Sequence, residues 1–195
     1  MPLFAIIAKN GIHKDFMSKL RHLNNVTVMA VKKGHCGIFS TEDLGMLMHI
    51  PVDTNFKKYL YNATRNKVLI KVARELYYNP IAGVISTGIL ERIARLLHWN
   101  KFIYVSLETQ LSLTGRISQL TMKRLTVMTT GKSSTVKTPF GVIEFTHTKR
   151  DIRSLADEIY FDDETGIFRA TEYRAIADLK RVGRNVDMII EDAHA

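Results

Sequence analysis

Apolar residues recur at helical spacing on both sides of a proline near position 50. Leu44, Leu47 and Met48 lie three and four positions apart, which predicts a helix with one apolar face. Ser40 precedes this run and is a favourable N-cap residue. Pro51 opposes simple continuation of the helix, because proline lacks the amide proton that a helix interior needs. The pattern therefore predicts a helix followed by a turn.

A second helix is predicted over residues 54–65, with Asp53 as its N-cap. Phe56, Leu60 and Ala63 share one face of this helix and would be buried. The outward positions are polar or basic: Thr54, Asn55, Lys57, Lys58, Tyr61, Asn62 and Arg65. Lysine and arginine contact DNA phosphates, and asparagine, threonine and lysine can reach base edges. This face is typical of a helix that enters a DNA groove.

A two-stranded hairpin is predicted directly after this helix. Val68, Ile70 and Val72 alternate with other residues, and residues 76–78 form a β-prone partner. Arg74 lies at the turn between them, where the tip of a wing would meet a phosphate. The layout is that of a winged helix-turn-helix, with Lys67, Lys71 and Arg74 added to the candidate DNA-binding residues. The same layout also occurs in dimerisation modules that bind no nucleic acid.

The flanking segments complete a prediction of the α+β class, with domains at 1–80 and 81–195. Before the winged helix-turn-helix, we expect short helices over 3–9 and 13–23, broken at Asn10-Gly11, and a helix over 26–33 capped by Gly34. The second domain has fewer clear signals, and Trp99 is expected in its core. Its predicted helices cover 87–98, 107–114, 151–160 and 170–182, and its predicted strands cover 102–106, 123–130, 135–141, 142–148 and 167–169, after a linker or short strand at 81–84.

The net charge of +9 is unevenly distributed along the chain. Residues 1–80 and residues 81–150 each carry +7, whereas residues 151–195 carry −5. A basic body suggests a polyanionic partner, and an acidic C-terminal part could face a basic one. The simpler alternative for either sector is a charged surface that keeps the protein in solution.

The remaining chemistry is sparse, so we expect no cofactor, no metal and no enzymatic activity. The single cysteine, Cys36, excludes an internal disulfide and a cysteine-cluster zinc site. Residues 131–134 resemble the end of a P-loop, but Thr126 stands where that motif needs a glycine. The acids from Asp157 to Glu164 have no histidine or lysine at fixed spacing for acid–base catalysis. No apolar run reaches membrane-spanning length, and residues 3–8 are too short for a signal segment, so we expect a cytoplasmic protein.

Several segments resemble AbiEi-type antitoxins of bacterial abortive-infection toxin–antitoxin systems (AbiE, type IV). They follow the family's order over about residues 26–185. Residues 103–118 resemble its "Y-I-S-x-x-S-A-L-x-x-H-G-L-I" segment, residues 125–130 and 138–147 resemble its "T-P-x-G" hairpin, and residues 167–178 resemble its "P-E-K-A-L-x-D" segment. The end of the wing, at 74–80, is similar to the family's "G-x-Y-x-x-P". The chain departs from the family at Glu75, which replaces a wing glycine, at Thr114, which replaces a histidine, and at Thr171, which replaces a proline.

The resemblance implies a DNA-binding antitoxin with a function in phage defence. Its winged domain would repress its own operon through inverted repeats in the promoter. Its second domain would neutralise a cognate AbiEii-type nucleotidyltransferase toxin. The alternative is a winged-helix transcriptional regulator, or a protein-interaction module, unrelated to a toxin. The resemblance assigns no role to residues 1–23.

Overall fold

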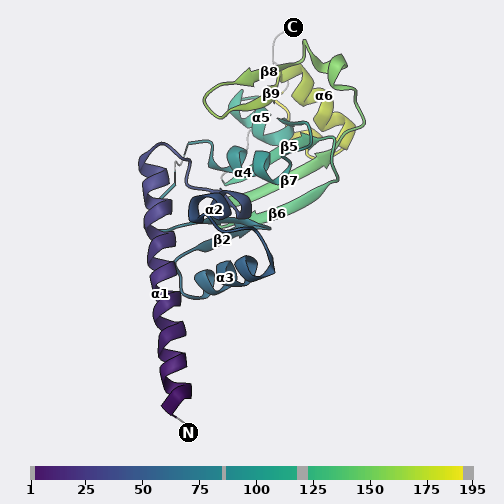
Figure 1. Cartoon of the computed structure of the whole chain (residues 1–195). Coiled ribbons are helices and arrows are strands. Elements are labelled where there is room, and N and C mark those ends of the chain that lie inside the picture. Colours follow the sequence, from purple (N-terminus) through teal and green to yellow (C-terminus); the bar gives the residue numbers. More distant parts are fainter. Residues whose placement is uncertain (1–2, 85–86, 118–122, 191–195) are drawn as a thin grey trace. The chain divides into compact units, whose positions relative to one another are not determined.

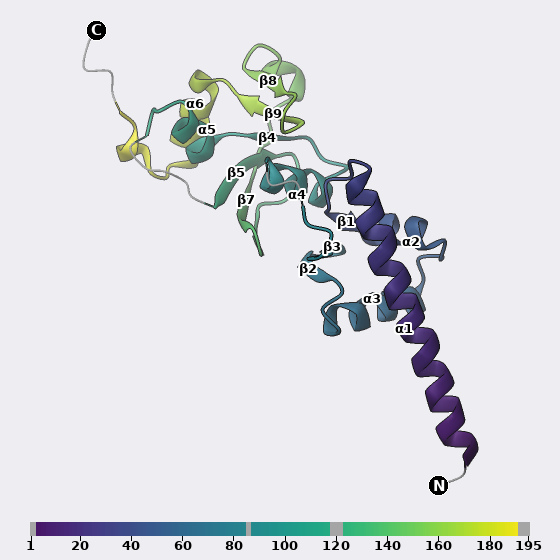
Figure 2. The same ribbon diagram turned by 90° about the vertical axis from the view of Figure 1, so that its left-hand side faces the viewer.

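The computed structural model describes residues 3–84, 87–117 and 123–190, with side chains from residue 16 onward. Its contacts divide the chain into two compact units, residues 1–85 and 86–195. The sequence placed this boundary after residue 80. Figures 1 and 2 together label the helices and strands of both units. The chain is of the α+β class, as predicted.

The first unit begins with one long helix, α1 (Leu3–Lys32). The prediction of separate helices over 3–9, 13–23 and 26–33 was wrong, because α1 runs through Asn10 and Gly11 without a break. Glycine costs only about 1 kcal/mol in a helix interior, and no proline is present to stop the helix. Figures 1 and 2 show the N-terminal turns of α1 extending past α2 and α3. The helix ends as predicted at Gly34, where φ is +97° and His35 N donates to Ala30 O over 3.0 Å.

Two further helices and a small sheet complete the first unit. These elements are α2 (Thr41–Met48), α3 (Thr54–Arg65), β1 (Phe39–Ser40), β2 (Ile70–Ala73) and β3 (Leu76–Tyr78). The strands form an antiparallel sheet in the order β1-β3-β2. One apolar core joins the helices, with fully buried side chains such as Leu23 of α1, Leu44 of α2 and Leu60 of α3. The two helices and the hairpin predicted over 40–78 are therefore confirmed as secondary structure.

A buried asparagine ties the end of β3 to α1. Asn79 is fully buried, and its Nδ2 donates to Asn24 Oδ1 over 2.9 Å and to Thr27 Oγ1 over 2.8 Å. Its Oδ1 accepts from the backbone N of Ile81 over 2.9 Å. Because a buried amide is costly unless its hydrogen bonds are made, this network holds the hairpin in one position against α1.

The second unit is built on a six-stranded mixed sheet in the order β6-β7-β5-β4-β9-β8. Neighbouring strands are antiparallel except for β7 with β5 and β4 with β9, which are parallel. The strands are β4 (Ile103–Val105), β5 (Arg124–Thr129), β6 (Ser134–Thr138), β7 (Gly141–His147), β8 (Ile159–Asp162) and β9 (Ile167–Ala170). The helices are α4 (Ile89–Leu97), α5 (Leu107–Leu113) and α6 (Glu172–Val182), with 3-10 turns at Ile152–Leu155 and Val186–Met188.

Helices cover both faces of this sheet. Tyr104 and Met128 belong to the same buried cluster as apolar side chains of α5 and α6. On the other face α4 contacts β7 and β9, and His98, directly after α4, stacks on Phe145 of β7 with ring centroids 3.9 Å apart. The register partner of Phe145 is Val127, which points away from Met128 because side chains alternate along a strand.

A wholly buried carboxylate lies inside the second unit. Asp178 Oδ2 accepts from Tyr104 Oη over 2.9 Å and from Ser106 Oγ over 3.0 Å, while its Oδ1 lies 3.1 Å from Arg174 Nη2. Arg174 also donates to Glu158 Oε2 over 2.9 Å. Burial and the neighbouring Asp178 carboxylate raise the pKa of Tyr104 above its usual value. These contacts join β4, α6 and the start of β8.

Three expectations for the second unit were wrong or only partly right. Trp99 is 82% exposed rather than in the core, because α4 ends at Leu97 and leaves it in the following loop. The predicted helix over 151–160 is only the 3-10 turn Ile152–Leu155, followed by the unforeseen strand β8. The helix predicted over 87–98 begins after Gly88, and Ser86, the serine directly before the predicted range, lies outside the described residues. Residues 81–84 contain no strand.

The acid stability of the second unit should depend on Asp162. Its Oδ2 accepts from Thr165 Oγ1 over 2.6 Å and from Arg169 Nε over 2.5 Å, and these bonds lower the pKa of the carboxyl from 3.8 to about 2. A lowered pKa gives stability that is present above about pH 4 and lost as the pH falls toward 2. We therefore expect Asp162→Asn to reduce the free energy of unfolding at neutral pH by about 1–2 kcal/mol, and to remove part of the loss between pH 4 and 2.

Denaturant unfolding at pH 7, 4, 3 and 2 measures this difference. Asp163→Asn changes the same charge at an exposed neighbour outside the hydrogen-bonded cluster, so it is the matched control. If the free energy of unfolding of Asp162→Asn falls with pH in parallel with that of the wild type, Asp162 does not contribute to the acid sensitivity of the second unit.

Candidate nucleic-acid interface

The helix α3 has one buried stripe and a polar outer face, as predicted. Asp53 caps its N-terminus, with Oδ1 accepting from Phe56 N over 2.7 Å. Phe56, Leu60 and Ala63 are buried in the core of the first unit. Six of the seven predicted outward residues are exposed and Asn62 is half-buried: Thr54, Asn55, Lys57, Lys58, Tyr61, Asn62 and Arg65. The burial of one stripe thus determines which side chains α3 presents to solvent.

The turn before α3 is closely packed against α2. Ser40 and Asp43 form a reciprocal capping box at the start of α2, over 3.0 and 2.8 Å. The helix ends at His49, which has a left-handed backbone with φ of +54°. A Cβ atom added to Gly45 would lie 2.7 Å from Val52 Cγ2 and 3.1 Å from Ile50 O. Glycine at this position therefore permits the turn to pass close to α2 and start α3 after only five residues.

The long helix α1 supports the opposite flank of α3. Tyr59 Oη donates to the backbone O of Lys19 over 2.9 Å. The Tyr59 ring meets Phe16 edge-on, with centroids 6.1 Å apart. Burial raises the pKa of Tyr59 to about 12, so the phenol keeps its proton at neutral pH. The contact fixes the orientation of α3 about its own axis.

The hairpin β2–β3 lies beside the first turns of α3. Its turn contains Arg74 and Glu75, and its register shifts between Lys71 and Ala73. Glu75 has a φ of +57°, in the left-handed region that favours glycine. Glu75 therefore occupies a turn position whose backbone conformation glycine adopts more readily. Lys71 and Arg74 are both exposed.

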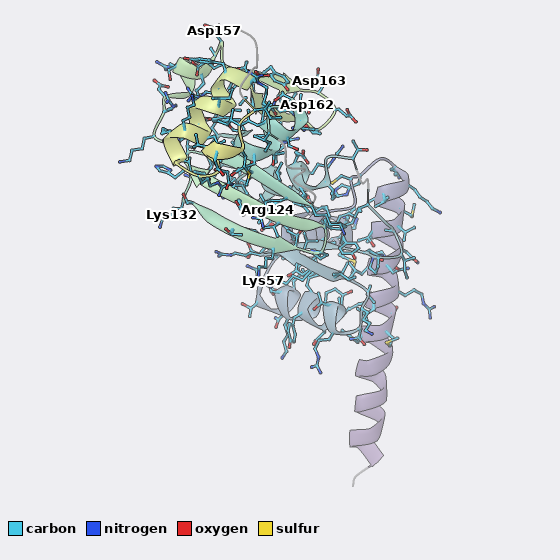
Figure 3. The ribbon with its side chains drawn as sticks, turned by 180° about the vertical axis from the view of Figure 1, so that it is seen from behind. Lys57, Arg124, Lys132, Asp157, Asp162 and Asp163 are labelled. Atoms are coloured by element: carbon cyan, nitrogen blue, oxygen red, sulfur yellow. The ribbon has the colours of Figure 1, made fainter. Side chains whose placement is uncertain are left out.

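An ion pair connects α3 to the tip of the hairpin. Lys57 Nζ lies 3.0 Å from Glu75 Oε1, with both side chains about half exposed. The hydrogen bond from Lys57 lowers the pKa of the Glu75 carboxyl. Figure 3 labels Lys57 on the ribbon. Helical spacing places Lys57 on the hairpin side of α3 and Lys58 on its outermost line, so the two lysines have different surroundings.

The local charge is strongly positive. Residues 54–74 contain six basic residues and no acidic one: Lys57, Lys58, Arg65, Lys67, Lys71 and Arg74. All six are exposed. The nearest carboxylates are Asp53, used as the cap of α3, and Glu75, paired with Lys57. The structure thus places the ten predicted DNA-binding residues on α3, on the hairpin that follows it, and, for Lys67, in the turn between them.

Sequence reasoning missed two residues that shape this surface. Glu75 neutralises part of its charge, and Tyr59 anchors the helix that carries it. The partners of these residues are 18 and 40 positions away in the chain. No local sequence pattern predicts a contact between residues so far apart in the chain.

The metal, nucleotide and carboxylate candidates lie outside α3 and the hairpin. No group of three metal-ligating side chains occurs among the described residues. The segment 131–134 lies between β5 and β6 rather than before a helix, which removes the context that a P-loop requires. Glu108 of α5 is buried, and its Oε1 lies 2.8 Å from Arg184 Nε and accepts from Asn185 Nδ2 over 2.8 Å. Of the helices described, none has the length and apolar character needed to cross a membrane.

Comparison with protein-family models, with curated proteins and with solved structures finds no match to this chain. The assignment of the site therefore depends on its own geometry and charge.

Proposed function

We propose that residues 24–79 form a winged helix-turn-helix that binds duplex DNA, with α3 in the major groove and the β2–β3 turn at the adjacent backbone. The observation that carries this proposal is the outer face of α3, which is exposed, basic and rich in hydrogen-bonding side chains. A major groove about 12 Å wide admits an α-helix. The phosphates on either side of the groove require cations, which the helix and hairpin supply.

The outermost line of α3 provides the base-reading candidates. Thr54, Lys58, Tyr61 and Arg65 recur at intervals of four, three and four residues, so they lie along one line of the helix. That line spans roughly 16 Å at 1.5 Å per residue. Asn55 lies beside its first turn and has an amide that can pair with adenine. Lys67, Lys71 and Arg74 continue the basic surface onto the hairpin.

Replacing two of these side chains should weaken sequence-selective binding. We expect Asn55→Ala with Lys58→Ala to reduce affinity for the cognate duplex by about 1–3 kcal/mol and to lower the slope of log K against log salt by about one. The measurement is fluorescence anisotropy with a labelled duplex from the region upstream of the gene. A scrambled duplex is titrated beside it, at two salt concentrations.

The matched control is Lys33→Ala, which removes the same charge at the C-terminal end of α1, outside α3 and the hairpin. Circular dichroism and thermal unfolding should show both variants folded. If the double variant binds the upstream duplex as tightly as the wild type, α3 is not the reading helix. Equal weak binding of the wild type to both duplexes would show that the basic surface binds polyanions without sequence preference.

Removing the acidic group at the hairpin tip should have the opposite effect. Glu75 competes with phosphate for Lys57 and repels the DNA backbone, so Glu75→Gln should raise affinity and steepen the salt dependence. An increase of about three- to tenfold at low salt corresponds to about one additional phosphate interaction. Unchanged or weaker binding by Glu75→Gln would place the hairpin tip away from the DNA.

The resemblance to AbiEi-type antitoxins extends this proposal to a biological role. In that role the chain represses its own operon through promoter inverted repeats and neutralises a cognate AbiEii-type nucleotidyltransferase toxin. The DNA-binding half is supported by the surface of α3. The antitoxin half is supported only by the ordered segments over 103–178. The alternative is a winged-helix regulator or interaction module with no toxin partner.

Co-expression separates these two readings. We expect the neighbouring gene, expressed alone, to arrest bacterial growth, and co-expression of this chain to restore growth. The Asn55→Ala and Lys58→Ala double variant should still restore growth when both genes are driven by foreign promoters, because promoter binding is then irrelevant. Growth that the neighbouring gene does not affect, or arrest that this chain does not relieve, would favour the regulator without a toxin.

A further inference from the structure

The strand β8 is an open edge of the six-stranded sheet. Among the described strands it pairs only with β9. Thr171 N donates to Glu158 O over 2.8 Å, which makes residues 158 and 171 a hydrogen-bonded pair. Because such pairs alternate along an antiparallel ladder, the backbone N–H and C=O groups of Ile159 and Phe161 point to the free edge. An edge of this kind can accept another extended segment.

One face of this edge is aromatic. Phe161 of β8 and Phe168 of β9 are 50% and 37% exposed, with ring centroids 5.2 Å apart. Phe102, just before β4, lies 5.4 Å from Phe168. The register of Tyr104 with Phe168 places these rings on the α6 side of the sheet. Clustered exposed phenylalanines on a folded unit are typical of a protein-binding surface.

The opposite face of the edge is polar and acidic. Tyr160 and Asp162 point there, beside a hollow of about 770 Å³ that Glu91 and Glu164 also line. Arg169 lies between two carboxylates, with Nε 2.5 Å from Asp162 Oδ2 and Nη2 3.1 Å from Glu91 Oε1. These three side chains carry two carboxylates and one guanidinium, and the guanidinium of Arg95 lies beside Gly166 in the β8–β9 turn. Lys123 and Arg124 line the hollow as well, and Arg124 is paired with Glu144.

The segment around β8 contains only acidic charges. Residues 157–164 include five acidic residues and no basic one. Asp157, Asp163 and Glu164 are exposed. Figure 3 labels Asp157, Asp162 and Asp163 in this part of the second unit. The charge of this segment therefore favours a partner that supplies positive charge.

We propose that β8 is a docking edge for an extended segment of a partner protein in which apolar residues alternate with lysine or arginine. The segment adds a strand beside β8 through the backbone groups of Ile159 and Phe161. Its apolar side chains then lie on Phe161 and Phe168, and its basic side chains lie over Tyr160 and Asp162. Strand addition of this type takes affinity from the main chain and specificity from alternate side chains. The inference concerns the second unit and does not rest on DNA binding by the first.

A second copy of the chain fits this edge less well. Two β8 strands paired with each other would set five acidic residues against the same five, and directly opposed like charges destabilise a sheet. The other edge strand, β6, contains one lysine, Lys137. Pairing of β6 with β8 would be head-to-tail and would lead to closed rings or open filaments. The charge of the edge thus favours a different, basic chain.

Synthetic peptides test the proposal on the full chain. The probe is a peptide of about eight residues, a usual strand length, in which lysine and valine alternate. One comparison peptide has the same composition with the lysines in one block and the valines in another. The second comparison peptide has glutamate in place of each lysine. We expect the alternating lysine peptide to bind about tenfold or more tightly than either comparison. Amide hydrogen exchange at Phe161 should slow in the complex, whereas exchange at Tyr160, whose amide faces β9, should not change.

Variants of β8 complete the experiment. Phe161→Pro removes the ring and the outward amide but no hydrogen bond to β9, so it should lose about tenfold in affinity while remaining folded. Asp163→Lys should weaken binding in a salt-dependent way. Tyr173→Ala, an exposed aromatic on α6, is the control and should bind as the wild type does. Circular dichroism reports the fold of each variant.

Two results would overturn the proposal. One is equal binding of all three peptides, or full affinity in Phe161→Pro. The other is concentration-dependent self-association that Lys137→Glu abolishes, which would assign the β8 edge to a second copy of the chain.

Discussion

The burial of one stripe of α3 is the constraint on which the first unit depends. Phe56, Leu60 and Ala63 complete a core that α1 and α2 also enter, so α3 cannot rotate without exposing apolar area. Each buried large side chain contributes about 1.5–3 kcal/mol. The polar face follows from this packing, because the side chains between the buried positions project from the opposite side of the helix toward solvent. Tyr59 and Asn79 then reduce the remaining freedom by fixing α3 and the hairpin to α1.

The second unit uses a different device to hold its layers together. Its core contains charged side chains, with Asp178 and Arg174 both buried, paired with each other and hydrogen-bonded to Tyr104, Ser106 and Glu158. Breaking such a pair on one side leaves an uncompensated buried charge, which costs several kcal/mol. The arrangement therefore specifies how α6 meets β4 and β8. It also explains why β8, a short strand with exposed aromatic residues, holds a defined position at the edge of the sheet.

The sequence predicted helices well where an N-cap residue precedes a segment whose apolar residues have clear helical spacing. Helix α3 has the predicted limits because Asp53 begins it and the stripe from Phe56 to Ala63 has a clear helical period. The β2–β3 and β6–β7 hairpins were predicted from their strand alternation, and α6 from its helical spacing. Helix α1 was divided wrongly because Asn10 and Gly11 are weak helix formers rather than helix breakers. Trp99 was misplaced because size alone predicts burial, whereas its loop leaves it exposed.

Contacts distant in sequence were beyond such reasoning. The ten candidate DNA-binding residues could be proposed because helical spacing and hairpin alternation act over a few residues. The pairing of Lys57 with Glu75 and the order of strands in the larger sheet depend on tertiary structure. The edge position of β8 was missed for this reason. Its acidity was visible in the sequence, but an acidic segment has the same composition whether it lies in a turn or at the edge of a sheet.

We propose that the two charged surfaces select partners by shape as well as by sign. The basic residues of the first unit lie on a helix and a short hairpin, a shape that matches the major groove of DNA because the groove is wide enough for a helix. The acidic edge of the second unit offers a row of backbone groups, which only an extended chain can use. A basic helix such as α3 therefore cannot pair with the free backbone groups of β8. Attraction between copies of the chain is then limited to electrostatic forces, which salt screens within about 10 Å. Opposite charge alone would make this chain bind itself, and the difference in backbone geometry is what permits both surfaces to coexist in one protein.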